Sequence, residues 1–268
     1  MSAQSVFSSV VRGFLALTVA ACAGACVAPQ EEADDDGHDH GDVPEGDTAD
    51  QSALTPGVRV PQSLGLNKHG VVYLTFDDGP SPYTAKILDT LKAHNAKATF
   101  FLTGANIPGR EEVIKREAAE GHIVASHQQK HVQATMGDFT TWIPAEKAKI
   151  ESLVPGQPHL FRYPYGAGTE AKETFLKANG YPDGGIGWDI DSLDWCYGGG
   201  GGRCTRSEVP AAYRTDPIGF TMNQIRRLGG GVVLMHDVQK ITAQNLDTIL
   251  DQIEAMGLKY GELPHEGR

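Results

Sequence analysis

The chain has 268 residues, 40% of them hydrophobic, which is enough to bury a core as one large domain or two small ones. Its formal charge is −11, but ten of its 34 acidic residues lie in residues 31–50, which contain no lysine or arginine. The other 24 acids nearly balance the 23 bases, so the body of the chain lacks the basic excess that nucleic-acid binding requires.

The N-terminus has the pattern of an export signal. Arg12 precedes an apolar run, residues 13–21, that is too short to cross a bilayer as a helix. The run ends in VAAC, which resembles the site where a lipoprotein signal is cut and the new N-terminal residue, Cys22, is lipidated. AGAC, ending at Cys26, is a poorer second match. We expect an exported protein that is lipid-anchored or secreted, and an uncleaved buried helix is the alternative.

An acidic segment follows the signal. The segment from Pro29 to about Pro56 is polar and acidic and carries no hydrophobic periodicity, which predicts a disordered, self-repelling tether. His38 and His40 within it could bind a metal weakly, but the composition favours a solvated spacer. The expected organisation is therefore a signal peptide in residues 1–22, a tether in 23–56 and a folded domain in 57–268.

From residue 70 onward, short apolar runs alternate with amphipathic stretches. The predicted strands are 71–76, 98–103, 122–126, 159–163, 185–190, 231–235 and 258–262. The Ser81–Pro82 pair is typical of a helix start, and further helices are predicted over 110–120, 169–179 and about 242–256. Seven strands alternating with six helices predict one parallel α/β domain, either a closed barrel or a doubly wound sheet.

Polar side chains gather where these strands end, and such folds carry their chemistry at the C-terminal ends of strands. They are Asp77 and Asp78, His127 and His131, Arg162, Asp191 and Asp194, and His236 and Asp237.

Two histidines and one aspartate are a common ligand set for a divalent metal with open positions. His127 and His131 alone are a weak signal, because two surface histidines often have this spacing. Asp77 and Asp78 alone would more often be turn residues, and His236 could be a buried core histidine. Arg162 could form a surface ion pair or hold an aspartate through bidentate hydrogen bonds. Together, these strand ends favour a metal site with a carboxylate beside it as general base.

Five motifs occur in order: TFDDGP at 75–80, HxxxH at 127–131, RYPYG at 162–166, DSLDW at 191–195 and LMH at 234–236. This series resembles the polysaccharide deacetylase family, which is the NodB-homology domain of carbohydrate esterase family 4. The resemblance spans about residues 68–264. It implies a distorted (β/α) barrel with about seven parallel strands, which makes the domain over 57–268 catalytic.

The resemblance also implies a role for each motif residue. Asp78, His127 and His131 would bind one divalent metal, zinc first, with cobalt or nickel as alternatives. Asp77 would be the catalytic base held by Arg162, and His236 the general acid tuned by Asp194. The remaining implied roles are the backbone N–H of Tyr165 as an oxyanion donor, and Trp195 and Leu234 as walls of the acetyl pocket.

Two features depart from the family pattern. The family usually has Ser or Thr after the first motif histidine and Pro after the second, where this chain has Gln128 and Val132. The Gln128 amide could take over the loop-supporting hydrogen bond of the missing hydroxyl. In an exported protein, Cys196 and Cys204, which flank a glycine-rich run, favour a disulfide over free thiols.

The expected function is metal-dependent removal of N-acetyl groups from an amino-sugar polymer, with release of acetate. Peptidoglycan, a chitin-like polymer and poly-N-acetylglucosamine remain open as substrates. The alternatives are an O-acetyl esterase on a xylan-like polysaccharide and a non-catalytic envelope lipoprotein that binds polysaccharide or metal. Asp77, Arg162 and His236 argue against the last, because metal binding alone requires none of them. The expected partners are the polysaccharide and, through the lipid anchor, a membrane, with no nucleic acid and a monomeric state.

Overall fold

The computed structural model describes residues 58–59, 66 and 70–265. The expected signal peptide, lipidation at Cys22 or Cys26 and acidic tether therefore lie outside the described residues.

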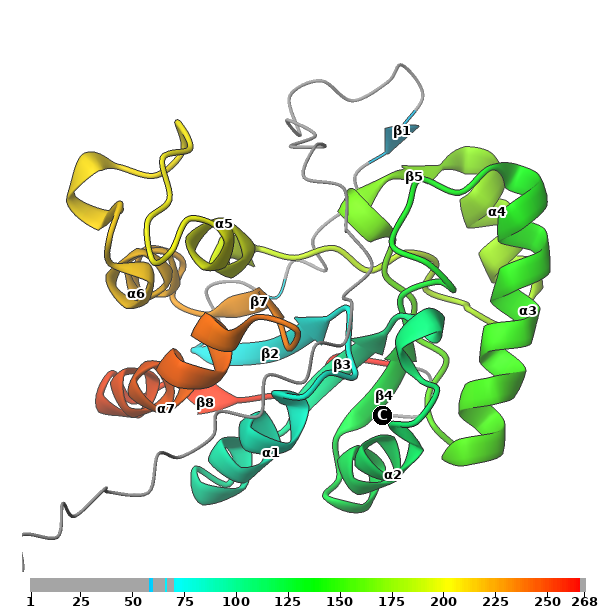
Figure 1. The fold of residues 1–268 in the computed structure, drawn as a ribbon, viewed down its shortest axis with the longest axis horizontal. Coiled ribbons are helices and arrows are strands. Elements are labelled where there is room, and N and C mark those ends of the chain that lie inside the picture. The colour runs from blue at the N-terminus through cyan, green and yellow to red at the C-terminus, as the bar shows by residue number, and fades with distance from the viewer. Residues whose placement is uncertain (1–57, 60–65, 67–69, 266–268) are drawn as a thin grey trace, which may run out of the picture. The chain divides into compact units, whose positions relative to one another are not determined.

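A parallel sheet forms the centre of the folded domain, and helices cover its outer face (Figure 1). Its hydrogen-bonded strand order is β4-β3-β2-β7-β6, with β8 pairing the start of β2. A separate two-stranded sheet pairs β1 with β5 in antiparallel register. The strands are β1 (Val58–Arg59), β2 (Val71–Asp77), β3 (Ala98–Leu102), β4 (Ile123–Ser126), β5 (Gly168–Thr169), β6 (Ile190–Asp191), β7 (Gly231–His236) and β8 (Lys259–Tyr260).

One segment, residues 185–191, links the two edges of the sheet. Phe161 makes parallel bridges both to Ser126, at the end of β4, and to Gly185. A few residues later, β6 pairs with β7 at the opposite edge. Because this segment reaches both edges, the sheet closes, which confirms the expected distorted barrel and excludes an open doubly wound sheet.

The predicted strands 159–163 and 185–190 are wrong as full strands. Only bridges at Phe161 and Gly185 and the short β6 remain of them. The physical reason lies partly in Arg162, whose guanidinium takes the carbonyls of Ile186 and Gly187 as acceptors in place of a neighbouring strand. Pro164, which has no N–H for a ladder, ends the earlier segment.

Alternation along β2 explains how a polar site forms at the end of an apolar strand. Val72, Leu74 and Phe76 belong to the core cluster that includes residues of α1 and α7. The alternate residues point to the barrel interior, where Tyr73 packs against a second cluster. Thr75 and Asp77 continue this inward series, so strand geometry directs the Asp77 carboxylate into the barrel.

Seven α-helices lie in the described part of the chain. They are α1 (Thr84–Ala93), α2 (Glu111–Ala119), α3 (Met136–Leu153), α4 (Glu170–Ala178), α5 (Asp194–Gly199), α6 (Pro217–Leu228) and α7 (Lys240–Ala255). Short 3-10 turns lie at η2 (Gly104–Asn106), η3 (Pro164–Gly166) and η4 (Ala211–Tyr213). Within these described ranges, none of the helices combines the length and the apolar character that a bilayer crossing would need.

The predicted helix start at Ser81–Pro82 is wrong by a few residues, since α1 begins at Thr84. The Ser81 hydroxyl still accepts a hydrogen bond from the Tyr83 N–H at 3.0 Å, as a helix-capping serine does, and it also donates to the carbonyl of Asp237 at 2.6 Å. The predicted helices over 110–120, 169–179 and 242–256 correspond to α2, α4 and α7.

Candidate active site

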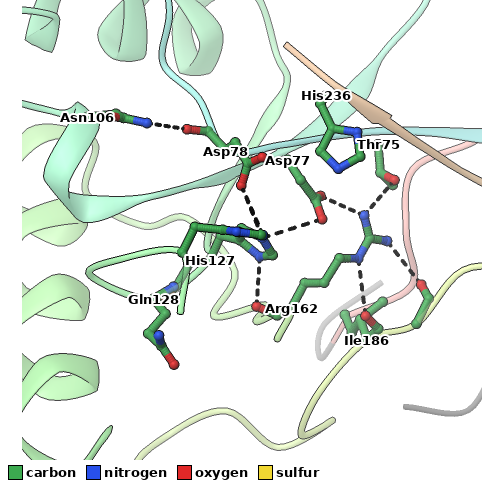
Figure 2. A network of polar contacts seen from close by, with 12 residues as sticks. Thr75, Asp77, Asp78, Asn106, His127, Gln128, Arg162, Ile186 and His236 are labelled. Carbon is green, nitrogen blue, oxygen red and sulfur yellow. Dashed lines mark hydrogen bonds and ion pairs between the residues drawn. The ribbon is translucent and has the colours of Figure 1, made fainter. Parts of the chain in front are cut away.

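Asp77 lies at the C-terminal end of β2, and Arg162 reaches it from across the barrel (Figure 2). Arg162 Nη1 donates to Asp77 Oδ1 at 2.8 Å and to Thr75 Oγ1 at 2.7 Å. Arg162 is fully buried, and Asp77 is 2% exposed. Each buried charged group therefore has the other as its compensating partner.

The Arg162 contact differs from the bidentate pair that sequence alone allowed. One hydrogen bond joins its guanidinium to Asp77, while Nε and Nη2 donate to the carbonyls of Ile186 and Gly187. The guanidinium also lies over the Phe101 ring, 4.2 Å from its centroid. Arg162 thus fixes Asp77 Oδ1. The other carboxylate oxygen, Oδ2, lies 3.7 Å from His127 Nε2.

Asp78 turns away from Asp77 because its backbone adopts the left-handed region, with φ of 76°. Its Oδ1 lies 3.4 Å from His127 Nε2 and 3.6 Å from His131 Nε2. The structure thus brings together the three residues that sequence predicted as metal ligands, although they come from two different loops.

These three side chains fit a divalent cation. Asp78 Oδ1 is buried and has no hydrogen-bond partner among the described residues, as expected of an atom that needs a cation. His127 Nδ1 donates to the carbonyl of Arg162 at 2.9 Å, which turns the lone pair of Nε2 toward Asp78. One carboxylate and two imidazoles form a donor set typical of zinc or a related transition metal.

The charges of the cluster shift its pKa values in opposite directions. Burial opposes ionisation of Asp78, but His131, His127 and His236 together lower its pKa. Burial likewise disfavours a charged His127, yet Asp77 and Asp78 raise its pKa. For His131, burial outweighs the nearby carboxylates and lowers the pKa, which favours the neutral ring that a metal requires.

His236, at the end of β7, is oriented by a carboxylate. Its Nδ1 donates to Asp194 Oδ1 at 2.7 Å, and its backbone N–H donates to Asp194 Oδ2 at 2.7 Å. Burial opposes the charge of His236, but Asp194, with Asp78 and Asp77 beyond it, raises its pKa to about 10. The ring is therefore protonated at neutral pH. It lies on the other side of Asp77 from His127 (Figure 2).

The three residues expected at the oxyanion and acetyl positions occupy different surroundings. Tyr165 lies in the turn η3 with φ of 58°, and its ring packs on His131 with centroids 4.3 Å apart. Trp195 is half-buried in the first turn of α5. Leu234 is buried in β7, where it pairs with Thr75 on one side and Asp191 on the other.

Gln128 supports the loop that carries both histidines. It is 1% exposed and has φ of 72°. Its Nε2 donates to the carbonyls of Lys130 at 2.7 Å and Val132 at 3.0 Å, which lie on either side of His131. In Figure 2 its side chain is turned away from Asp78, so it acts on the loop and not on the ligand cluster.

A disulfide joins Cys196 to Cys204, the pairing expected from sequence. It ties the glycine-rich loop to α5, the helix that begins with Asp194. Arg206, just beyond the loop, lies over the Trp195 ring, with its guanidinium carbon 5.3 Å from the centroid. The loop thus packs directly on the element that orients His236.

Three supporting residues were not predicted from the sequence. Thr242 on α7 donates to Asp194 Oδ2, and Asn106 in η2 donates to the carbonyl of Asp78 at 2.7 Å. Glu146 on α3 accepts a hydrogen bond at 2.7 Å from the hydroxyl of Ser126, the residue before His127. None lies in a motif. Of the three, only Glu146 carried a signal, as an acidic residue on the buried stripe of a helix.

Comparison with known proteins agrees with this geometry. The sequence model described as polysaccharide deacetylase matches residues 65–183. A peptidoglycan-N-acetylglucosamine deacetylase from Bacillus cereus is 34% identical over 212 residues, covering 77% of this chain and 73% of the relative. The corresponding enzyme PgdA from Listeria monocytogenes is 35% identical, and the chain spans 41% of its length and is itself 77% covered.

Among solved structures, the polysaccharide deacetylase Bc1974 from Bacillus cereus superposes with a TM-score of 0.61 at 31% identity, covering 74% of this chain and 94% of that one. The fold and site together define a barrel hydrolase with its polar residues at the strand ends. The chain belongs to the polysaccharide deacetylase family. Its enzyme class is polysaccharide N-deacetylase.

Proposed function

We propose that the chain removes N-acetyl groups from peptidoglycan with the aid of one divalent metal ion, zinc in the first place, and releases acetate. The relatives named above as peptidoglycan deacetylases support this choice of polymer. The site itself accounts for the reaction type.

The observation that carries the proposal is the meeting of three separate units at one end of the barrel. Asp78, His127 and His131 form a candidate cation site. Asp77 is held by Arg162, and His236 by Asp194, on two sides of it. A protein that only bound metal or sugar would need neither the fixed carboxylate nor the charged imidazole.

Asp78, His127 and His131 would hold the metal. When bound, it would polarise the acetamide carbonyl and acidify a water molecule, since an amide is otherwise a poor electrophile. Asp77 would accept a proton from the attacking water through Oδ2, while Arg162 keeps Oδ1 in place.

His236 would complete the reaction as the general acid. Its protonated ring would donate to the sugar nitrogen as the carbon–nitrogen bond breaks, so that the products are acetate and a free amine. Asp194 keeps that ring charged and correctly turned. The backbone N–H of Tyr165 would donate to the developing oxyanion, and Trp195 and Leu234 would border the acetyl methyl group.

We further propose that the protein works outside the cytoplasm, in the cell envelope, with its N-terminal Cys22 as the lipid anchor and residues 23–56 as the tether to the catalytic domain. Relatives named for peptidoglycan support an envelope location.

Acetate release tests the proposal. The chain is incubated with peptidoglycan, chito-oligosaccharide and acetylxylan, each with and without chelator. We expect release from peptidoglycan that chelator abolishes and zinc restores. Release from acetylxylan alone would favour the O-acetyl esterase, and no release from any of the three would favour a non-catalytic binding protein.

A further inference from the structure

Two carboxyl side chains, Glu117 on α2 and Asp237 after β7, lie behind the site and take no part in the chemistry described above. Both are 0% exposed. In the described part of the chain, both Glu117 oxygens and Asp237 Oδ1 are buried without a hydrogen-bond partner. An unpaired buried carboxylate is costly, so these atoms require an explanation.

Asp237 fastens the turn that follows Asp78. Its Oδ2 accepts a hydrogen bond from Thr84 Oγ1, its carbonyl accepts one from Ser81 Oγ, and its N–H donates to the carbonyl of Asp77. A Cβ on Gly79 would lie 2.1 Å from Asp237 Oδ2, so only glycine allows this approach. The Asp237 side chain therefore packs directly against the backbone between Asp78 and α1.

The surroundings of Glu117 disfavour its charge. Burial, followed by the charge of Asp237, raises the pKa of Glu117 well above its ordinary value. Burial also raises the pKa of Asp237 to about 7, with Asp78 and Asp77 adding to the effect and Thr84 and His236 opposing it.

Cations of α2 and of the neighbouring α3 pair with other carboxylates. Lys115 pairs with Glu112, and Arg116 pairs with Asp89 on α1 and with Glu120. Lys149 on α3 pairs with Glu111. Two buried carboxylates without a cation between them are not both ionised, because each charge disfavours the other.

We propose that Glu117 keeps its proton at neutral pH and so adds no second buried negative charge near Asp237, and that Asp237 holds the Gly79 turn and with it Asp77 and Asp78. Asp237 is a positioning residue, since it acts on the site through the backbone. The protonation of Glu117 does not depend on the proposed function. The positioning role of Asp237 does rest on the proposed function.

Unfolding midpoints measured across pH test the proton on Glu117. A buried acid that stays protonated binds its proton more tightly in the folded than in the unfolded chain, so it lowers stability as pH rises above the unfolded pKa of about 4.3. Glu117→Gln removes this titration. We expect its midpoint to equal that of the wild type near pH 4.5 and to exceed it by about 3 °C or more at pH 8.

Glu112→Gln is the matched control, because Glu112 lies on the same helix with its side chain 88% exposed. It should show no gain that grows with pH. Parallel wild-type and Glu117→Gln curves would overturn the proposal. If Glu117→Gln folds poorly, infrared spectra of the wild type and of Glu117→Met at pH 7 decide instead. We expect the protonated-carboxyl C=O band to be weaker in the variant, and equal bands in both would contradict the proposal.

Zinc affinity, measured by calorimetry, tests the positioning role. Asp237→Asn keeps the acceptor for Thr84 without requiring a charge, so we expect affinity within about threefold of the wild type, whereas Asp237→Ala should bind about tenfold more weakly. Unchanged affinity in Asp237→Ala, or equal loss in both variants, would refute it. Neither measurement uses a polymer, so inactivity on every polysaccharide would defeat the proposed function alone.

Discussion

Asp77 and Asp78 are neighbours in sequence, yet they serve different partners because the backbone turns between them. Asp77 completes the inward series of β2 and faces Arg162, whereas Asp78 adopts a positive φ and faces two histidines. Substitutions of the two carboxylates should therefore have different effects. Substitution of Asp77 should lower turnover, and substitution of Asp78 should weaken metal binding.

Asp77→Asn is expected to lower kcat by about 10²–10⁴-fold, because the amide cannot accept the proton of the attacking water. Zinc affinity, measured by calorimetry, should change little. His127→Ala should lose both activity and zinc binding. Glu112→Gln, which alters a carboxylate on α2 whose side chain is 88% exposed, serves as the control. A fully active Asp77→Asn enzyme would contradict the assignment of Asp77 as base.

Sequence could predict the motif residues because each follows an apolar run that ends at the same edge of the barrel. It could not predict how Arg162 would distribute its hydrogen bonds. That distribution depends on the carbonyls of Ile186 and Gly187, which are free to accept because their segment forms no regular strand. Thr242 was missed for a related reason, since only the packing of α7 brings its hydroxyl to Asp194.

At the scale of elements, the loop after β4 shows how this chain accommodates its departure from the family pattern. Gln128 reaches across the loop to two carbonyls, which a shorter hydroxyl at the same position could not span together. The loop carrying His127 and His131 is thus closed by its own side chain, and Tyr165 adds a hydrogen bond to the carbonyl of His131.

Gln128→Ala should weaken zinc affinity on the order of tenfold, because His131 loses the support that orients it. Gln128→Glu should weaken it further, since a carboxylate would face two carbonyl oxygens without a proton to donate. Gln129→Ala, the same residue type one position later, is the matched control. Calorimetry that finds wild-type affinity in Gln128→Ala would show that the loop holds its shape without the amide.

Three predicted helices followed their apolar periodicity closely, whereas α3 and α6 were not predicted and the short strands differed from their predicted bounds. α2, α4 and α7 lie within a few residues of their predicted bounds, because each carries a stripe of buried side chains. The segments around Phe161 and Gly185 depend instead on long-range contacts with Arg162. Local pattern therefore could not show that they would form single bridges in place of strands.

At the scale of the whole molecule, the alternation of strands and helices left open whether the parallel strands form a closed barrel or an open sheet, and only the family resemblance implied the barrel. Closure depends on residues 185–191 reaching both edges, a contact between segments that no local pattern encodes. It also sets the geometry of the site, because it brings Arg162 and His236 to opposite sides of the β2 end.

The candidate metal ligands come from two loops, one after β2 and one after β4. A bound metal ion would link these loops and should therefore stabilise the whole fold. Free zinc at about 100 times its dissociation constant adds about 2.7 kcal/mol to the free energy of unfolding. For a domain of this size that raises the melting midpoint by about 5–10 °C. Differential scanning calorimetry of the chelator-treated protein, with and without zinc, measures the shift.

In His127→Ala the shift should nearly vanish, whereas Asp77→Asn should retain most of it, because Asp77 is the base and not a ligand. An equal zinc shift in His127→Ala would mean that the ion binds elsewhere on the protein.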